Sequence, residues 1–419
     1  MPSQHRDALL ARAAQCFDEV SSKTRLLDSI QWSQETEQTF FANNADVLPE
    51  PTYQIDTATA RANIERLDEL DRAIDGQDAL MSYLRTIAAS YRDANLMLLA
   101  VGTPRFYELS LAQYGGANTY ALDQDTTNLA LAIHLGTRLG RGLRRSDDDP
   151  SRLSASEFAR SLETKLAERQ PELEVKVVVD DHLAPKVIAG ARRVRVRAGA
   201  TFSALEADSL FVHEIETHAL TAQNGMGQAH LPFLRAGGPR TTRTQEGLAV
   251  FAELFDRTLS IGRLQRLVER VRMVAMAEQG ASFLDVYRHL LTLGAEPREA
   301  YLDTARIFRG GLVAGGGPFT KDAAYLAGLA EVYNFLRLTL ADSSRTIAEV
   351  LVSGRLALED VELLLALREE GLIEPPRFLP GWLARWDALL PYFAFTSFLN
   401  ELDLAPATER FSRLSMPPM

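Results

Sequence analysis

Two histidines and a glutamate lie within six residues of one another in the segment 211–218, which reads Phe-Val-His-Glu-Ile-Glu-Thr-His. Neutral imidazole is the commonest protein ligand for zinc, and a glutamate beside the activated water is the usual base of a zinc hydrolase. His213 and His218 are therefore candidate metal ligands, and Glu214 is a candidate general base. The alternative is a core helix that carries two histidines without a metal.

The spacing of the two histidines is one residue longer than in the familiar helical signature H-E-x-x-H. Here it is H-E-x-x-x-H, and residues five apart on an ideal α-helix point about 140° away from each other. His213 and His218 reach one ion only if the helix is locally widened, as in the π-bulges that occur at functional sites. The sequence therefore predicts a widened helix between these two residues.

The segment around the histidines has the signals of a bounded helix. Ser203 and Glu206 have the spacing of a capping box, which predicts that the helix begins there. Asn224 and Gly225 tolerate positive φ, which predicts that it ends there. We expect a helix over about 204–223.

A catalytic zinc site needs a third protein ligand. Glu246 follows His218 by 28 positions, in a run that reads as the first turns of another helix with Thr244 as its cap. Gly247 would let that helix approach the first one closely. Glu246 is therefore the candidate third ligand, and His230, in a loop, is its rival. The alternative is that Glu246 is only an acid favoured by the start of a helix.

The predicted β-structure comes directly before the histidines. Residues 173–179 are rich in valine, and 193–197 alternate strictly between arginine and valine, as in a half-buried strand. Peptidases can bind an extended substrate by pairing it with an edge strand. The strand that contains Val194 and Val196 is our candidate for this edge. Its arginines also suit the charged face of an ordinary edge strand.

Several other residues are candidates for substrate binding. The glycine-rich segment 310–317 precedes a predicted helix, where an anion such as a peptide's terminal carboxylate can bind. The neighbouring cations would supply charge: Arg306, Arg309 and Lys321. A structural hinge is the alternative for this segment. Candidates for stabilising the oxyanion of the reaction are His230, Arg243 and Tyr325.

The combination of HEIETH, NGMGQ and TQEGLA resembles the flavohemoglobin expression-modulating QEGLA motif proteins, which are related to the microtubule-associated tyrosine carboxypeptidases of animals. The resemblance covers about residues 45–340. It implies a zinc metallopeptidase with His213, His218 and Glu246 as ligands and Glu214 as base. The tubulin-tail substrate of the animal members is not carried over to this chain.

Composition narrows the class of protein. The chain has 419 residues, 46% of them hydrophobic, and a net charge of −11, which disfavours a nucleic-acid binder. Cys16 is its only cysteine, so neither an intrachain disulfide nor a thiolate zinc site can form. The N-terminus lacks the apolar stretch of a signal peptide or a membrane span. We therefore expect a cytoplasmic protein without membrane or nucleic-acid partners.

Together these features predict a predominantly helical α+β protein with a zincin-like metallopeptidase core and a small sheet. The expected regions are a helical N-terminal region (1–95), the catalytic core (96–340) and a helical C-terminal region packed on the core (341–419). The expected function is a carboxypeptidase that uses one zinc ion per chain and removes the last residue of a peptide or protein tail. The alternatives are a non-catalytic zinc-binding regulator and an amidase that acts on a small non-protein substrate.

Overall fold

The computed structural model describes residues 3–120, 123–140, 152–181, 183, 185–341 and 344–400. Within these ranges the chain is predominantly helical with a small amount of sheet, which confirms the predicted α+β class. The zincin-like character of the core and the three region boundaries stay predictions. No helix in the described ranges combines the length and apolar character needed to cross a bilayer.

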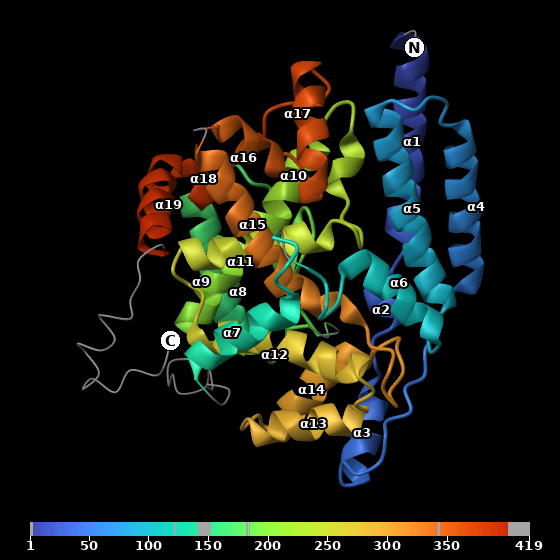
Figure 1. The fold of residues 1–419 in the computed structure, drawn as a ribbon, viewed down its shortest axis with the longest axis vertical. Helices are drawn as coiled ribbons and strands as arrows, with labels where there is room; N and C mark the ends of the chain where they lie inside the picture. The colour runs from blue at the N-terminus through green and yellow to red at the C-terminus, as the bar shows by residue number, and fades with distance from the viewer. Residues whose placement is uncertain are drawn as a thin grey trace.

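Helices α1, α4 and α5 form one flank of the molecule. Figure 1 shows α1, α4 and α5 side by side at this flank, where they pack against one another. The helices before the sheet are α1 (Ser3–Lys23), α2 (Leu26–Ser29), α3 (Gln34–Ala42), α4 (Thr57–Ala73), α5 (Ala79–Leu99), α6 (Pro104–Tyr114), α7 (Asn128–Leu139) and α8 (Ala155–Arg169).

The predicted strand 193–197 is present, but it is not at an edge. The strand β4 (Arg193–Arg197) lies between β2 (Lys176–Asp180), which is parallel to it, and β3 (Val187–Ala189), which is antiparallel. Val194 and Val196 are fully buried. The prediction of an edge strand at 193–197 was therefore wrong, because the sequence pattern shows which face is buried but not which strands pair. The edge strand next to the histidine helix is β3. A second, two-stranded sheet pairs β1 (Leu153–Ser154) with β5 (Thr201–Phe202).

The histidines lie on one continuous helical segment composed of α9 (Ala204–Leu210), η2 (Phe211–Ala219) and α10 (Leu220–Met226). Ser203 caps its start by accepting from the backbone of Glu206, but Glu206 pairs with Lys186 and does not complete the capping box.

The predicted stop at Asn224 and Gly225 was wrong, because tertiary contacts rather than chain reversal account for both residues. Asn224 is buried and donates to the carbonyls of Val352 and Phe378. Gly225 lies against the backbone of Leu234, where a Cβ would collide. Both residues are therefore inside the helix, which continues to Met226.

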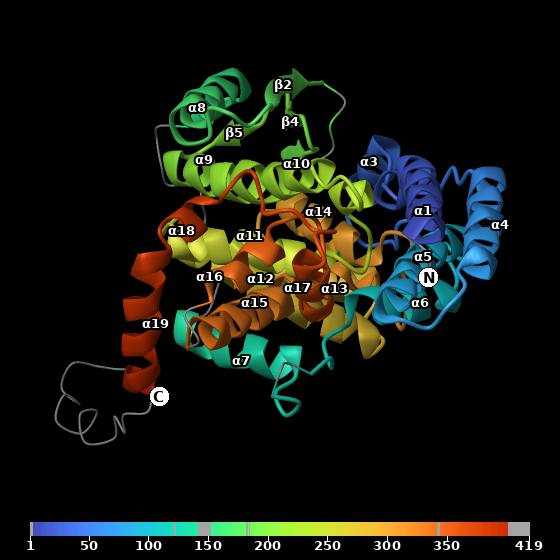
Figure 2. The ribbon, with the colours of Figure 1, turned by 90° about the horizontal axis from the view of Figure 1, so that it is seen from above.

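The elements around the histidine helix form layers, which Figure 2 shows from above. The helix α8 covers the outer face of the three-stranded sheet, and the sheet lies along the histidine helix. On the opposite side of that helix lies α11 (Thr242–Phe255), which packs against α15 (Ala324–Ala341). The close approach that we predicted for Gly247 is therefore real but has a different partner, since a Cβ there would collide with Gly328 of α15.

The remaining chain encloses these layers. One hydrophobic core contains Leu9 of α1, Phe211 of η2 and Phe393 near the C-terminus, so residues from all three predicted regions share it. The other elements after the histidine helix are η3 (Pro232–Arg235), α12 (Ile261–Glu278), α13 (Phe283–Thr292), α14 (Pro297–Phe308), η4 (Thr320–Ala323), α16 (Arg345–Leu351), η5 (Leu358–Asp360), α17 (Val361–Glu369), α18 (Gly381–Ala384) and α19 (Trp386–Asn400).

Candidate metal centre

The helix is widened where the histidine spacing requires it. Residues Phe211–Ala219 form a π-helix, and the N–H of Leu220 that follows donates to the carbonyl of Ile215, five residues earlier. The buried Thr217 hydroxyl donates to the carbonyl of Val212, also five residues earlier. A π-helix turn takes more residues than an α-helix turn, so His213 and His218 come onto one face. Their ring centroids lie 4.9 Å apart, and the predicted widening is confirmed.

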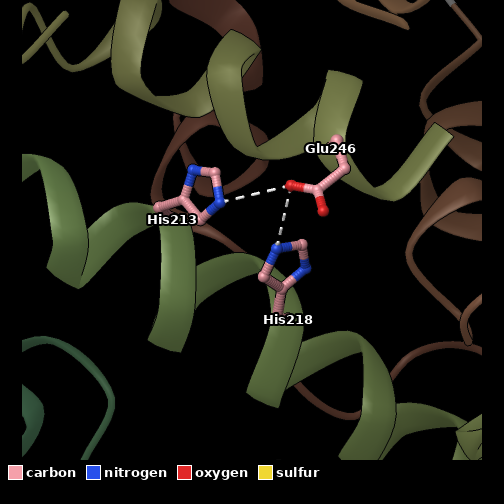
Figure 3. A group of neighbouring side chains, drawn as sticks. All are labelled: His213, His218 and Glu246. Carbon is pink, nitrogen blue, oxygen red and sulfur yellow. Dashed lines mark ion pairs between the residues drawn. The ribbon is translucent and has the colours of Figure 1, made fainter. Parts of the chain in front are cut away.

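The metal cluster, defined as His213, His218 and Glu246, is drawn in Figure 3. The two imidazoles project from η2 towards Glu246, which projects from the first turns of α11. Glu246 Oε2 lies 3.5 Å from Nε2 of His213 and 3.7 Å from Nε2 of His218. One ligand atom from each of the three residues falls within a mutual distance of 4.8 Å.

These three residues fit a divalent cation. Glu246 Oε2 is buried and has no hydrogen-bond partner in the described ranges, although an unsatisfied buried carboxylate oxygen is costly. It is directed at the two imidazole nitrogens, so the atom without a partner is also the one best placed to bind an ion between the three side chains. Two imidazoles and one carboxylate form the open donor set of a catalytic zinc site.

A second carboxylate orients the first histidine. Glu253 Oε1 lies 2.7 Å from Nδ1 of His213, and Arg263 pairs with the same carboxylate at 3.3 Å. An imidazole that donates from Nδ1 has its Nε2 free for a metal, and carboxylates often hold ligand histidines in this way. Glu253 therefore fixes His213 with Nε2 towards Glu246.

The electrostatics of the cluster match a site built for positive charge. Burial lowers the pKa of His213, but the nearby carboxylates of Glu246 and Glu253 outweigh burial and raise that pKa to about 10. Burial raises the pKa of Glu246, but Lys321 and the two histidines hold it well below its usual value. The carboxylates thus hold a proton on His213 in the metal-free site, and metal binding at such a site releases the proton.

The candidate base Glu214 lies between the histidine helix and the sheet. Its Oε2 accepts a hydrogen bond of 3.1 Å from the backbone N–H of Ala189 in the edge strand β3. Glu214 follows His213 directly in the π-helix, so the same element positions the candidate base and the two histidines. The Glu214 carboxylate is therefore hydrogen-bonded to the edge of β3 that faces the histidine helix.

Comparison with known protein families finds one whose sequence model matches most of the chain. The family described as microtubule-associated tyrosine carboxypeptidase matches residues 38–401. The chain belongs to this family. No curated protein matches the chain well enough to add to this assignment.

Arg355, in the C-terminal region of this carboxypeptidase family member, contacts the histidine helix. Arg355 Nη2 donates to the carbonyl of His218 at 3.0 Å, and Arg355 Nε is buried without a partner. Burial lowers the pKa of Arg355, and the carboxylates of Glu214 and Glu246 oppose that effect. No sequence pattern indicated this arginine, because it lies 137 residues from the carbonyl that it binds.

Two of the predicted substrate-binding cations already have carboxylate partners. Lys321 Nζ lies 3.1 Å from Glu246 Oε1, so this ammonium supports the metal cluster. Arg306 binds Asp322 through two hydrogen bonds of 2.7 and 3.0 Å. Arg309 has no carboxylate partner among the residues that the structure describes, and its guanidinium lies over the ring of Phe319. The structure therefore distinguishes three cations that the sequence treated as equivalent.

The three oxyanion candidates lie in different surroundings. Tyr325 is buried, with its hydroxyl 3.4 Å from Lys321 Nζ. Arg243 pairs with Glu331 at 3.0 Å and lies near the carbonyl of Tyr114. His230 is exposed in the loop after α10. Tyr325 alone of the three contacts a partner of the metal cluster within the described part of the chain.

Sequence reasoning missed Glu253, although a signal for it exists. Glu253 follows Glu246 by seven residues, close to two full turns of α-helix, so the two carboxylates lie on one face of α11. Thr244, which we expected to cap this helix, lies inside it, and its hydroxyl accepts from the N–H of Leu358. The helix begins at Thr242, and Glu246 therefore lies in its second turn.

Proposed function

We propose that this chain is a zinc-dependent metallopeptidase of the carboxypeptidase type, which removes the last residue of a peptide or protein tail. The observation that carries this proposal is the unpartnered Glu246 Oε2, which is buried and lies between the Nε2 atoms of His213 and His218. Membership of a carboxypeptidase family supports it. A purely structural metal site would need the three ligands but no base such as Glu214.

The roles of the chain's own residues follow from their contacts. His213, His218 and Glu246 would hold the zinc ion, with Glu253 fixing the orientation of His213. A zinc ion held there would polarise the scissile carbonyl and make water a stronger nucleophile near neutral pH. Lys321 keeps Glu246 ionised and therefore able to bind the cation.

Glu214 would act as general base and then as general acid. In this role its carboxylate takes a proton from the attacking water and returns it to the nitrogen of the leaving amino acid. The hydrogen bond from Ala189 holds Oε2, which leaves the other oxygen, Oε1, for the proton transfer.

The edge strand β3 would hold the substrate backbone. It pairs with β4 on one side only, so its other edge, which includes the N–H of Ala189, faces the histidine helix. Glu214 occupies the N–H of Ala189, so an extended peptide would pair with the rest of that edge and would run past Glu214. This role replaces the one that the sequence suggested for 193–197.

A peptide library tests the proposal directly. Zinc-loaded protein would be incubated with peptides whose last residue varies and includes tyrosine, the residue in the family's name, and the products would be read by mass spectrometry. We expect the loss of a single C-terminal residue, and no loss with the His213→Ala/His218→Ala variant. Internal cleavage, or release of ammonia from amides alone, would instead indicate an endopeptidase or an amidase. No cleavage by zinc-loaded protein would favour a non-catalytic regulator.

A further inference from the structure

A second cluster, of buried and partly exposed cations, adjoins the metal cluster and surrounds the ring of Tyr325. Lys321 Nζ lies 4.9 Å from the ring centroid, and the guanidinium carbons of Arg270 and Arg263 lie 5.1 and 6.0 Å from it. Arg306 of α14 and Arg309, which follows α14, complete the group, which we call the cationic cluster. Its members are Arg263, Arg270, Arg306, Arg309 and Lys321.

Positive charge exceeds negative charge in this cluster. Three carboxylates of the described residues lie beside members of this cluster: Glu246 beside Lys321, Glu253 beside Arg263, and Asp322 beside Arg306. Each of the three is already bound to one cation at hydrogen-bonding distance. Buried charges are normally paired, so two cations in this part of the protein lack a full partner.

Arg270 and Arg309 are these two cations. Arg270 is 8% exposed, its Nε is buried without a hydrogen-bond partner, and its nearest carboxylate, Asp322, is 3.8 Å away. Arg309 Nε is also buried without a partner. Burial, followed by repulsion from Arg306, lowers the pKa of both side chains, that of Arg309 to about 10. Both guanidiniums therefore have unused donors in a place where charge is costly.

The position of the two arginines relative to the metal cluster indicates what they bind. Lys321 Nζ contacts Glu246 on one side and the hydroxyl of Tyr325 on the other, and Arg270 lies over the same tyrosine ring. Arg270 is thus connected to the metal cluster through Tyr325 and Lys321. Arg309 lies near the same group, since its charge interacts with those of Arg306, Asp322 and Tyr325. This arrangement suits a substrate with its scissile bond at Glu214 and an anionic group a short distance beyond.

We infer that Arg270 and Arg309 form the subsite for the free α-carboxylate of the substrate's last residue. This inference rests on the proposed function. Guanidinium groups bind carboxylates through pairs of charge-assisted hydrogen bonds, which suits a group that must be recognised by shape and charge. Arg306, bound to Asp322, holds the surrounding charges in place instead of meeting the substrate.

Binding to an inactive zinc-loaded protein tests the subsite without relying on turnover. The Glu214→Gln variant would be titrated calorimetrically with three N-acetylated peptides. One ends in tyrosine as the free acid, the second ends in tyrosine amide, and the third is the amide with aspartate as its penultimate residue. We expect the acid to bind about ten- to a hundredfold more tightly than either amide, as for the loss of a charge-assisted contact.

Arginine variants in the same background locate the subsite. Arg270→Gln and Arg309→Gln should each reduce the preference for the acid over the amide by about tenfold or more. Arg272→Gln is the matched control, because Arg272 lies on the same helix as Arg270 but pairs with Glu269, and it should leave the preference unchanged. If Arg270→Gln does not fold, the affinities of Glu214→Gln and of Glu214→Gln/Arg309→Gln for the acid and the amide still test the subsite.

The outcomes separate this inference from the proposed function. Equal affinity for acid and amide would overturn the subsite, even if the wild-type protein cleaves peptides. Equal affinity for the acid and the aspartate-containing amide would also overturn it, since any carboxylate would then suffice. An acid preference that depends on Arg270 and Arg309 would support the subsite even if the wild-type protein cleaves nothing, and in that case only the proposed function would fail.

Discussion

The metal cluster and the cationic cluster are both largely enclosed, and Lys321 of the second contacts Glu246 of the first. Their atoms without partners are of opposite kinds. The metal cluster has an acceptor without a partner, Glu246 Oε2. The cationic cluster has donors without partners, Nε of Arg270 and Nε of Arg309. A cation would complete the first cluster, and an anion would complete the second. A peptide acid beside a zinc ion would supply both needs, one at each end of the site.

The two clusters also differ in how the chain builds them. The metal cluster uses two neighbouring elements, η2 and α11, whose ligands are recognisable in short motifs. The cationic cluster draws on α12, on α14 with the residue that follows it, and on η4, with Tyr325 of α15 at its centre. Motif-like spacing therefore accompanies the part that would do the chemistry, and the part that would select the substrate is dispersed along the chain.

The largest expected effect separates catalysis from metal binding within the first cluster. Glu214→Gln keeps the size of the side chain but removes the base, so peptide hydrolysis should fall by about 10²- to 10⁴-fold. Zinc content, measured by elemental analysis, should stay at about one ion per chain, because Glu214 is not among the three ligands. Turnover at the wild-type rate would show that another group is the base.

The next effect concerns the stability of the cationic cluster. Asp322 is almost fully buried between Arg306 and Arg270, so Asp322→Asn leaves buried cations unpaired and should cost roughly 3–5 kcal/mol of unfolding free energy at pH 7. Despite burial, the two arginines hold the pKa of Asp322 well below its ordinary value of 3.8. The stabilisation is therefore present above about pH 3.8 and is lost as the pH falls towards the folded-state pKa.

Urea denaturation of both proteins at pH 7 and pH 3 measures this difference. The gap between wild type and Asp322→Asn should narrow at pH 3, because only the unfolded wild-type aspartate takes up a proton there. Glu108→Gln is the control, since its pair with Arg105 is exposed on both sides and should contribute less than about 1 kcal/mol. A gap that does not change with pH would contradict the assignment of the stabilisation to an ionised Asp322.

A smaller effect tests whether Glu253 belongs to the metal site. Glu253→Gln removes the carboxylate that orients His213, and zinc affinity measured by chelator competition should fall by about 10- to 100-fold. Glu269→Gln is a matched control, because Glu269 contacts His289 and Arg272 in a similar arrangement outside the metal cluster. Equal losses of zinc affinity in the two variants would argue against a specific role of Glu253.

The smallest effect concerns the packing of α15, which carries Tyr325, against α11, which carries Glu246. Gly328 of α15 lies against the backbone of α11, and the Cβ of Gly328→Ala would collide with the carbonyl of Arg243. Overpacking of this kind should cost about 1–3 kcal/mol in thermal or urea unfolding. Gly136→Ala in α7 is the control, since its new Cβ would meet only ordinary contacts, and it should be neutral or slightly stabilising. Unchanged stability of Gly328→Ala would mean that α11 and α15 can move apart freely.

The sequence by itself determined the features that depend on local geometry. The five-residue spacing of His213 and His218 permits a shared ion only on a widened helix, and the π-helix Phe211–Ala219 has that form. The predominance of helix and the strand at 193–197 followed from residue periodicity in the same way. These features rest on contacts between residues a few positions apart, so the pattern of residue types was sufficient.

Only the tertiary structure decided which distant groups meet. The same alternation that identified β4 could not show that β2 and β3 flank it, because strand pairing joins segments separated by loops. Asn224 is a helix terminator by type, yet its side chain binds carbonyls 128 and 154 residues away. Arg306 and Arg309 are equally basic in the sequence, and only the position of Asp322 gives one a partner and leaves the other without. Charge and hydrogen-bond pairing in a buried site depend on distances in space, which residue type and spacing do not specify.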